Sequence, residues 1–430
     1  MAILYDGIGN KIETGGAETT VEPMDNDIPC VYIDGILPIE KSQVELNVVI
    51  RYASRTLTHE WYATAKVQGD SSAGYPKKNY TIKLYTDLSR SIKSKHGFRN
   101  WGKTNKFVLK ANWIDHSHAR NVVSARLWTE VVKSRSDFDS LPNELVSGNM
   151  AVDGFPVKVF NNGVYLGIYT WNLPKDALYG LDDEINENCI MQGDNGSYPD
   201  SEMFRGTTVS GVWSDELHDS MPSAISTAWT NILTFVSTAS DSDFVANFET
   251  HFDKQSIIDV LIFTWVACVI DNLGKNQTYF TYDAQKWYGG MYDLDGTWGL
   301  PPVPSSTRTW YDATAKFQDD YEAVVKSGKT NLLFERVLNL FSADVKTRYT
   351  ELRSSVLSEN KICGAFEEFT QVIPVSLYVE EYAETTGDGA FTEIPLVDTN
   401  NIQQIRQFIV NRLAYVDAEM KAMVPSETTE

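Results

Sequence analysis

The chain has 430 residues, of which 42% are hydrophobic and 12% aromatic, so it can build a sizeable buried core and is neither disordered nor fibrous. Its 37 basic and 58 acidic residues give a formal net charge of −21, which argues against general binding to nucleic acid. No apolar stretch approaches the length of about 20 residues that a membrane-spanning helix needs, so we expect no membrane insertion.

Residues 1–40 are predicted to form an N-terminal extension of short strands that serves as an attachment segment. Turn signals such as Asp6-Gly7 and Gly15-Gly16 separate its short apolar runs. The first residues lack the basic start and apolar run of a secretory signal peptide, so none is expected. The four cysteines are far apart and form no CxxC pair, which argues against a zinc site or a disulfide framework.

Residues 41–175 are predicted to form a β-rich region with one helix. Polar and apolar residues alternate over 79–85, the pattern of a half-buried strand. Apolar residues recur at helical spacing over 117–133, and Asn161-Asn162-Gly163 between two apolar runs predicts a hairpin. Further strands are predicted at residues 44–52, at residues 61–68 and from residue 107 onwards.

Residues 176–430 are predicted to be mainly helical. A stretch rich in Gly, Ser and Asp at 190–222 and a proline-rich stretch at 300–310 are predicted to be loops. A second hairpin is expected to join 277–282 to 287–292. Because strands come early and helices late, the fold class is predicted to be α+β. Helices are predicted at residues 222–239, 255–270, 329–341, 343–358, 362–376 and 400–422.

One basic stretch stands out in this acidic chain. From Lys66 to Arg120 there are twelve Lys or Arg residues against three Asp, a net charge of +9, and the rest of the chain has −30. Such a stretch indicates an anionic ligand, with a solvated basic face as the alternative. Glycines in the segment 68–78 let the backbone approach a ligand, and its amide groups can cradle phosphate; a plain hairpin loop is the other interpretation. Lys77, Lys78 and Lys83 could supply positive charge to such a ligand.

Acidic residues gather after the apolar helix predicted at 255–270. Asp271 follows it, Asn276 stands five positions later, and the second hairpin ends at Asp293-Leu294-Asp295-Gly296. Carboxylate and amide oxygens suit Mg²⁺, and phosphoryl transfer needs positioned metal ions and an oriented hydroxyl. The spacing is that of a protein-kinase catalytic loop and metal-binding element, although the usual His-Arg before the first Asp is absent. A helix end followed by ordinary Asp/Asn turns is the alternative.

Together these segments resemble the CotH kinase family over roughly residues 45–422. The family's Gly-Asn-Ser-Ser-like loop stands here at 69–72, and its Pro-Lys-Lys-Ser-Tyr motif stands at 76–80 as Pro-Lys-Lys-Asn-Tyr. The hairpin at 159–169 is similar to the family's Asn-Gly-x-Tyr-x-Gly-x-Tyr pattern. The sequence departs from the family at Asp70, where Asn is usual, and at Tyr292, where Trp is common. Other similar segments are Asn112 to Asn121, Asp271 to Asn276, Asp293 to Gly299, and a last helix with Phe408 and Arg412.

The resemblance implies a reduced, atypical protein-kinase-like fold, with an antiparallel β-rich N-lobe at 41–175 and a mainly helical C-lobe at 176–430. It also implies binding of ATP with Mg²⁺ or Mn²⁺ and phosphorylation of Ser or Thr on a protein substrate. By position, Asp271 would be the catalytic base, and Asn276 and Asp293 would be metal ligands. Asp295 competes with Asp293 for the metal.

The same resemblance implies where the nucleotide phosphates bind. The loop residues Gly69, Ser71 and Ser72 would contact them. Lys83 is the first choice for the phosphate-contacting lysine, and Lys78 and Lys110 are rivals. Arg120 would bind phosphate or anchor a carboxylate.

Two other functions stay open. Kinase-like folds with a reversed nucleotide transfer AMP, and others attach glutamate. The opening residues 3–12 resemble the start of some phage tail and baseplate proteins, so the chain could instead be a structural module of a virion. The expected partners are ATP and a protein substrate, and the expected location is the cytoplasm or a virion.

Overall fold

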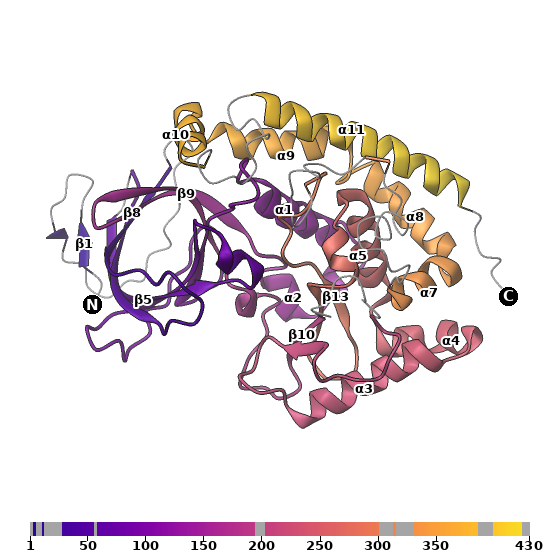
Figure 1. Ribbon diagram of the computed structural model, residues 1–430. Coiled ribbons are helices and arrows are strands. Elements are labelled where there is room, and N and C mark those ends of the chain that lie inside the picture. Colours follow the sequence, from indigo (N-terminus) through magenta and orange to yellow (C-terminus); the bar gives the residue numbers. More distant parts are fainter. Residues whose placement is uncertain are drawn as a thin grey trace. The chain divides into compact units, whose positions relative to one another are not determined.

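The computed structural model describes residues 3–5, 11–12, 28–55, 58–193, 203–300, 313–314, 331–385 and 399–423 (Figure 1). Contacts divide the chain into two compact units, and each is assembled from segments that are distant in sequence. The first comprises Met1–Val122, Val152–Ala177 and Glu367–Asn401. The second comprises Val123–Ala151, Leu178–Phe366 and Ile402–Glu430. None of the helices in the described ranges is long and apolar enough to cross a membrane.

The first unit is built around a closed barrel of seven strands. Neighbouring strands follow the order β5-β4-β3-β8-β9-β7-β6, and β6 pairs again with β5 to close the ring. The short strand β1 (Ile3–Tyr5) pairs with β5 outside the ring, and β2 (Lys11–Ile12) pairs with β1. The barrel strands are β3 (Cys30–Gly35), β4 (Leu46–Ala53), β5 (Thr58–Gln68), β6 (Asn79–Tyr85), β7 (Lys106–Lys110), β8 (Gly154–Asn161) and β9 (Val164–Asn172).

The α+β class predicted from the sequence is confirmed. The prediction of a purely antiparallel N-lobe was wrong, because the strands form a closed barrel that contains one parallel pair. The sheet is closed, and β3 pairs with β8 in parallel. Parallel neighbours need a long crossover rather than a hairpin turn, and β8 follows β3 only after more than a hundred residues. Closure leaves few unpaired strand edges, which a local pattern of alternation does not reveal.

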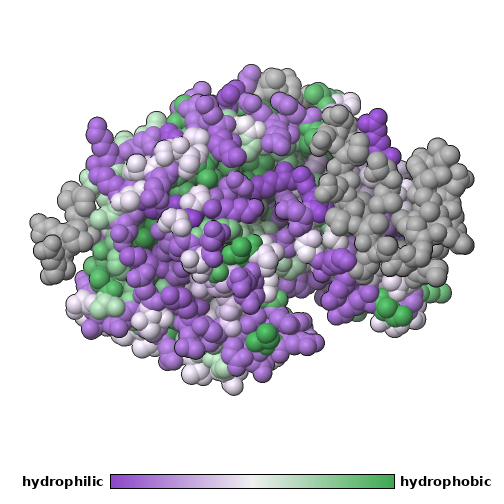
Figure 2. Space-filling view, turned by 180° about the vertical axis from the view of Figure 1, so that it is seen from behind, coloured by the Kyte–Doolittle hydropathy of each residue, from purple (hydrophilic) through white to green (hydrophobic). Residues whose placement is uncertain are grey.

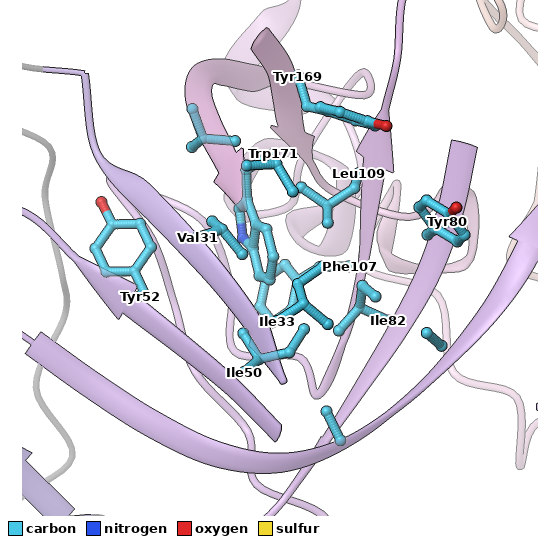
Figure 3. Close-up of a cluster of buried hydrophobic side chains, with 14 of the residues drawn as sticks. Val31, Ile33, Ile50, Tyr52, Tyr80, Ile82, Phe107, Leu109, Tyr169 and Trp171 are labelled. Atoms are coloured by element: carbon cyan, nitrogen blue, oxygen red, sulfur yellow. The ribbon is translucent and has the colours of Figure 1, made fainter. Parts of the chain in front are cut away.

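Alternate residues of the strands fill the barrel. On β6, Tyr80, Ile82 and Leu84 are buried in the core, whereas Thr81 and Lys83 between them are partly exposed. The side chains drawn in Figure 3, among them Ile82, Phe107 and Trp171, point towards one another inside the curve of strands. The rings of Phe107 and Trp171 stack with their centroids 5.0 Å apart. The strand predicted at 79–85 is thus confirmed with the same bounds, because its alternation matches the two faces of a barrel wall.

The hairpin predicted at 161–163 is also confirmed. Asn161 pairs with Val164, so the loop consists of Asn162 and Gly163, and both have positive φ, as a type I′ turn requires. A bulge follows, because Val159 pairs with Gly167 whereas Phe160 pairs with Tyr165. The extra residue changes the direction in which the later part of β9 presents its backbone groups.

An imidazole pair lies buried with the barrel's aromatic residues. His59 is only 2% exposed and stacks on Trp61 with ring centroids 5.1 Å apart. Neither ring nitrogen of His59 has a hydrogen-bond partner among the described residues. The His96 ring lies 5.8 Å from that of His59 and accepts a hydrogen bond from the Trp61 indole at 2.8 Å. Burial, and next the charge of His96, lower the pKa of His59 to about 4.

We therefore expect the barrel to lose stability in mild acid. The pKa of His59 is lower in the folded than in the unfolded protein, so protonation favours unfolding as the pH falls from about 6.5 towards 4. The loss from this residue should approach about 3 kcal/mol at the acid end. Urea unfolding at several pH values, with His59→Phe as the comparison, measures it. Equal loss of stability in acid for both proteins would contradict the attribution of this loss to His59, since phenylalanine keeps the stacked ring but cannot be protonated.

The second unit contains most of the helices and a four-stranded sheet in the order β11-β10-β12-β13. The strands are β10 (Cys189–Gly193), β11 (Trp213–Asp215), β12 (Gln277–Thr281) and β13 (Tyr288–Gly290). Helices of the described residues are α1 (Arg120–Lys133), α2 (Asn143–Ser147), α3 (Ser223–Thr238), α4 (Asp241–His251), α5 (Lys254–Ala267), α7 (Leu332–Leu340), α8 (Ser342–Arg353), α9 (Glu359–Gln371), α10 (Val375–Thr385) and α11 (Thr399–Ala422).

Several predictions for the second half need correction. The expected loop at 190–222 contains β10 and β11, whose pairing with β12 depends on residues far along the chain. Helix α4 was not expected, although Ser240 caps it by accepting from the Asp243 backbone N–H at 3.1 Å, a readable start signal. The helix expected at 362–376 ends at Gln371, and α10 begins after Pro374, because a proline disfavours helix before it. The predicted loop at 300–310 lies, beyond Leu300, outside the described residues.

On the face drawn in Figure 2, hydrophilic residues predominate and apolar residues form small separate groups. Among the described residues that this view draws in colour, no broad apolar patch of the kind that marks a large hydrophobic interface is visible.

Candidate functional site

The predicted catalytic segment follows the end of α5. Cys268 adopts a left-handed conformation with φ 57°, and the next amide, of Val269, donates to the Thr264 carbonyl at 2.9 Å. This is a Schellman-type helix end with cysteine where glycine is usual. The chain then enters a short 3-10 helix, Ile270–Leu273, which contains Asp271.

Asn276 and Asp293 are brought together from the two ends of the β12–β13 hairpin. The Asn276 amide donates to an Asp293 carboxylate oxygen at 3.4 Å, across 17 positions of sequence. Asn276 is 4% exposed, whereas Asp293 and Asp295 are partly exposed. Both members of the pair have positive φ, 54° and 55°, a conformation that Asn and Asp tolerate better than most residues.

Buried contacts within the second unit hold these two segments. The Asn272 side-chain amide donates to the Tyr292 backbone carbonyl at 3.2 Å, and the Trp298 backbone N–H donates to the Ala267 carbonyl at 2.8 Å. From α11, the Arg412 guanidinium donates to the Trp265 carbonyl at 2.7 and 3.1 Å. Arg412 is 1% exposed, so α11 supports the end of α5 through a buried charge. Sequence reasoning noted Arg412 without assigning it this role.

The donors that converge suit a hard divalent cation. In the ranges that the structure describes, no group of three or more His, Cys, Asp or Glu side chains is arranged to hold a metal ion. The convergent donors are instead an amide, of Asn276, and a carboxylate, of Asp293. Mg²⁺ is usually held by one or two carboxylates together with waters and substrate phosphates. A carboxylate and an amide oxygen are ligand types that Mg²⁺ accepts, so the chemistry of these two side chains is compatible with that ion.

In the first unit, the predicted phosphate loop is a tight turn between β5 and β6. Gly69 has φ 110°, a backbone conformation that residues with a side chain rarely adopt, and a Cβ there would lie 2.0 Å from the Ser72 hydroxyl oxygen, so a substitution would strain this turn. A 3-10 helix, Ser71–Gly74, follows. The Lys78 ammonium donates to the Ala73 carbonyl at 2.8 Å, which closes the loop on itself. Asp70 pairs with Lys41 at 2.8 Å, so a lysine partly neutralises the carboxylate that departs from the family.

The two other candidate lysines lie on the barrel wall. Lys83 on β6 pairs with Glu45 at 2.6 Å, and Glu45 also accepts from the Thr64 hydroxyl at 2.9 Å. Partial burial alone would raise the pKa of Glu45, but these hydrogen bonds lower it overall. The hydrogen bond to Glu45 raises the pKa of Lys83, which keeps its ammonium charged. Lys110 is partly exposed at the end of β7.

Arg120 is 2% exposed at the start of α1 and pairs with the equally buried Asp115 at 2.7 Å. The other Asp115 oxygen accepts the Arg120 backbone N–H at 2.7 Å, and the Ser117 hydroxyl donates to the same carboxylate. Two roles were expected for Arg120, binding phosphate or anchoring a carboxylate. This geometry fits the second role, because the Arg120 guanidinium holds the Asp115 carboxylate. Phosphate binding would require the guanidinium to leave or share that partner.

A buried cluster that sequence reasoning missed lies beside β9. Lys77 and Glu381, 304 positions apart, form an ion pair whose side chains are each 12% exposed. Glu381 also accepts from His118 at 2.5 Å, and the Lys77 ammonium lies 4.5 Å from the centre of the Tyr169 ring. Burial alone would raise the pKa of Glu381, but Lys77 and then His118 lower it to about 2, so the carboxylate is ionised at neutral pH.

This cluster completes the backbone pairing of β9. Strand β7 pairs only with residues 170–172 of β9. The backbone N–H and C=O of Ile168 are instead bonded to the side chains of Glu381 and Lys77. The Ile168 amide donates to Glu381 at 3.1 Å, and the Ile168 carbonyl accepts from Lys77 at 2.5 Å. Gly167 leaves the space, since a Cβ there would lie 2.5 Å from the Glu381 carboxylate. Helix α10, which contains Glu381, is thereby fastened to the strand (Figure 1).

A family model described as CotH kinase protein matches residues 65–416. This span includes every candidate site residue from Gly69 to Asp295, as well as Glu381 and Arg412. No curated protein matches the chain.

Proposed function

Because this chain belongs to the CotH kinase protein family, we propose that it is an ATP-dependent protein kinase that phosphorylates Ser or Thr hydroxyls. The family match covers most of the chain and supports a phosphotransferase at the level of the family. The observation that carries the proposal further is the Asn276–Asp293 pair at 3.4 Å, in the order and spacing of a kinase metal site.

In the proposed reaction, the substrate hydroxyl oxygen attacks the γ-phosphorus of ATP while the bond to the β–γ bridging oxygen breaks, and ADP leaves. Asp271 accepts the hydroxyl proton. Asn276 and Asp293 would hold Mg²⁺ or Mn²⁺, with Asp295 as the competing ligand, and the ion would neutralise charge on the phosphates.

For the nucleotide phosphates we propose the Gly69 loop and one lysine. Lys83 remains the first choice, since its ammonium is partly exposed and paired rather than buried. Lys78 and Lys110 remain rivals. Lys77 is an unsuitable candidate, because its ammonium is already enclosed by Glu381, Ile168 and Tyr169.

The test is transfer of label from ATP radiolabelled at the γ-phosphate, with Mg²⁺ or Mn²⁺ and casein or myelin basic protein as acceptor. We expect label on protein that depends on the metal. Label from the α-phosphate instead would indicate AMP transfer, and a mass increase equal to glutamate would indicate glutamylation. No label together with no thermal stabilisation by ATP and metal would overturn the proposal.

A further inference from the structure

The long connection between β6 and β7, residues 86–105, has a structure that the proposed chemistry does not use. Connections of this length without their own helices are uncommon in compact domains and are often functional. It contains five Lys or Arg residues against one Asp, in a chain whose net charge is −21. We call residues 86–105 the basic insert.

The basic insert is firmly held. The Arg90 guanidinium donates to the Ala63, Leu88 and Val48 carbonyls at 2.8, 2.8 and 3.0 Å. Asp87 accepts from the Ser91 and Ile92 amides at 3.1 and 2.7 Å. These bonds fix the turn before the lysines, so the surface that they present is pre-organised.

Two inward-facing residues alternate with two outward-facing lysines. Lys93 and Lys95 are exposed, whereas Ser94 and His96 are buried. His96 pairs with Thr104 in a short antiparallel bridge, which brings the exposed Lys103 onto the neighbouring segment. The same insert has two large apolar side chains that face solvent: Leu88 is 70% and Ile92 59% exposed.

Exposed lysines and exposed aliphatic side chains in one short insert fit an acidic polypeptide segment with an apolar residue. Single-stranded nucleic acid fits less well, since it needs aromatic side chains for base stacking. Phe98 and Trp101, the aromatic residues of the insert, are both buried, and the Trp101 indole donates to Asp153 at 3.0 Å.

We propose that the basic insert is a docking surface for an Asp/Glu-rich segment of a partner protein. Lys93, Lys95 and Lys103 supply the charge, and Leu88 and Ile92 supply the apolar contact. Docking at this surface is independent of the phosphotransfer proposed above, and it requires neither ATP nor metal.

The test is fluorescence anisotropy of a labelled, Glu/Asp-rich peptide that includes one Leu, titrated with the full chain at low and at high salt. We expect binding that weakens with salt, and roughly tenfold or greater loss of affinity in Lys93→Glu/Lys95→Glu. The matched control, Lys361→Glu/Lys421→Glu, makes the same change of net charge at exposed positions in the second unit and should bind like wild type. Leu88→Ser/Ile92→Ser should weaken binding without altering its salt dependence.

Three outcomes would overturn the proposal. The first is that wild type does not bind the peptide at low salt. The second is that both charge-reversed variants lose affinity equally. The third is that a single-stranded oligonucleotide binds more tightly than the peptide and depends on the same lysines. Lys93→Gln/Lys95→Gln, which only neutralises the charges, guards against misfolding and should lose less affinity than the reversal. Each variant is compared with wild type by melting temperature.

Discussion

Replacing Asp293 with Asn should lower the rate of phosphoryl transfer by about a thousandfold, because it removes a negative ligand from the proposed metal site, worth several kcal/mol in the transition state. Asparagine is the informative substitution. It keeps the size of the side chain and an oxygen that accepts from Asn276, and it tolerates the positive φ of 55°. Alanine would add backbone strain and confuse a folding defect with a catalytic one.

Metal dependence separates the roles of the two acidic residues. Asp293→Asn should raise the Mg²⁺ or Mn²⁺ concentration needed for half-maximal rate. Asp271→Asn should slow transfer by about a hundredfold or more, the contribution of a general base, and leave the metal requirement unchanged.

The control is Asp283→Asn, which makes the same chemical change in the exposed turn of the same hairpin. It should retain the wild-type rate and metal dependence. Full activity in Asp293→Asn at ordinary metal concentration would reject Asp293 as a ligand and transfer that role to Asp295.

Glu381→Ala should destabilise the first unit by about 3–5 kcal/mol, the usual cost of removing one member of a buried ion pair. The substitution leaves the Lys77 ammonium, the His118 ring and the Ile168 amide without the carboxylate that they contact. Water cannot easily replace it, since the Glu381 side chain is only 12% exposed.

Urea unfolding at neutral pH measures this loss, and a double-mutant cycle with Lys77→Met isolates the pair. Because Lys77→Met removes the charge that Glu381 would otherwise leave unpaired, the double variant should lose less stability than the sum of the single ones. The surface pair Lys41–Asp70 is the matched comparison, and Lys41→Ala should cost less than about 1 kcal/mol. A similarly small loss in Glu381→Ala would mean that water or another group solvates Lys77.

Local patterns determined those elements whose signal lies within a few residues. Alternation placed β6 at its observed bounds, and Asn162-Gly163 predicted the β8–β9 hairpin because only a few residue types adopt the backbone of its turn. The end of α5 was less visible. The helix was expected to continue to residue 270, but it ends at Ala267 in a left-handed Cys268, where the sequence has no glycine to signal it.

The order of motifs along the chain indicated the family, and the spacing, the ligand chemistry and the family resemblance together singled out Asn276 and Asp293. Tertiary structure decided which distant segments meet within each unit. It closed the barrel through β5–β6 and the parallel β3–β8 pair, brought Arg412 to the end of α5, and joined Lys77 to Glu381. Such contacts join residues distant in sequence, and they form only when burial and charge pairing together outweigh the entropy of closing long loops. No local pattern records that balance, so the sequence marks these residues as polar but does not name their partners.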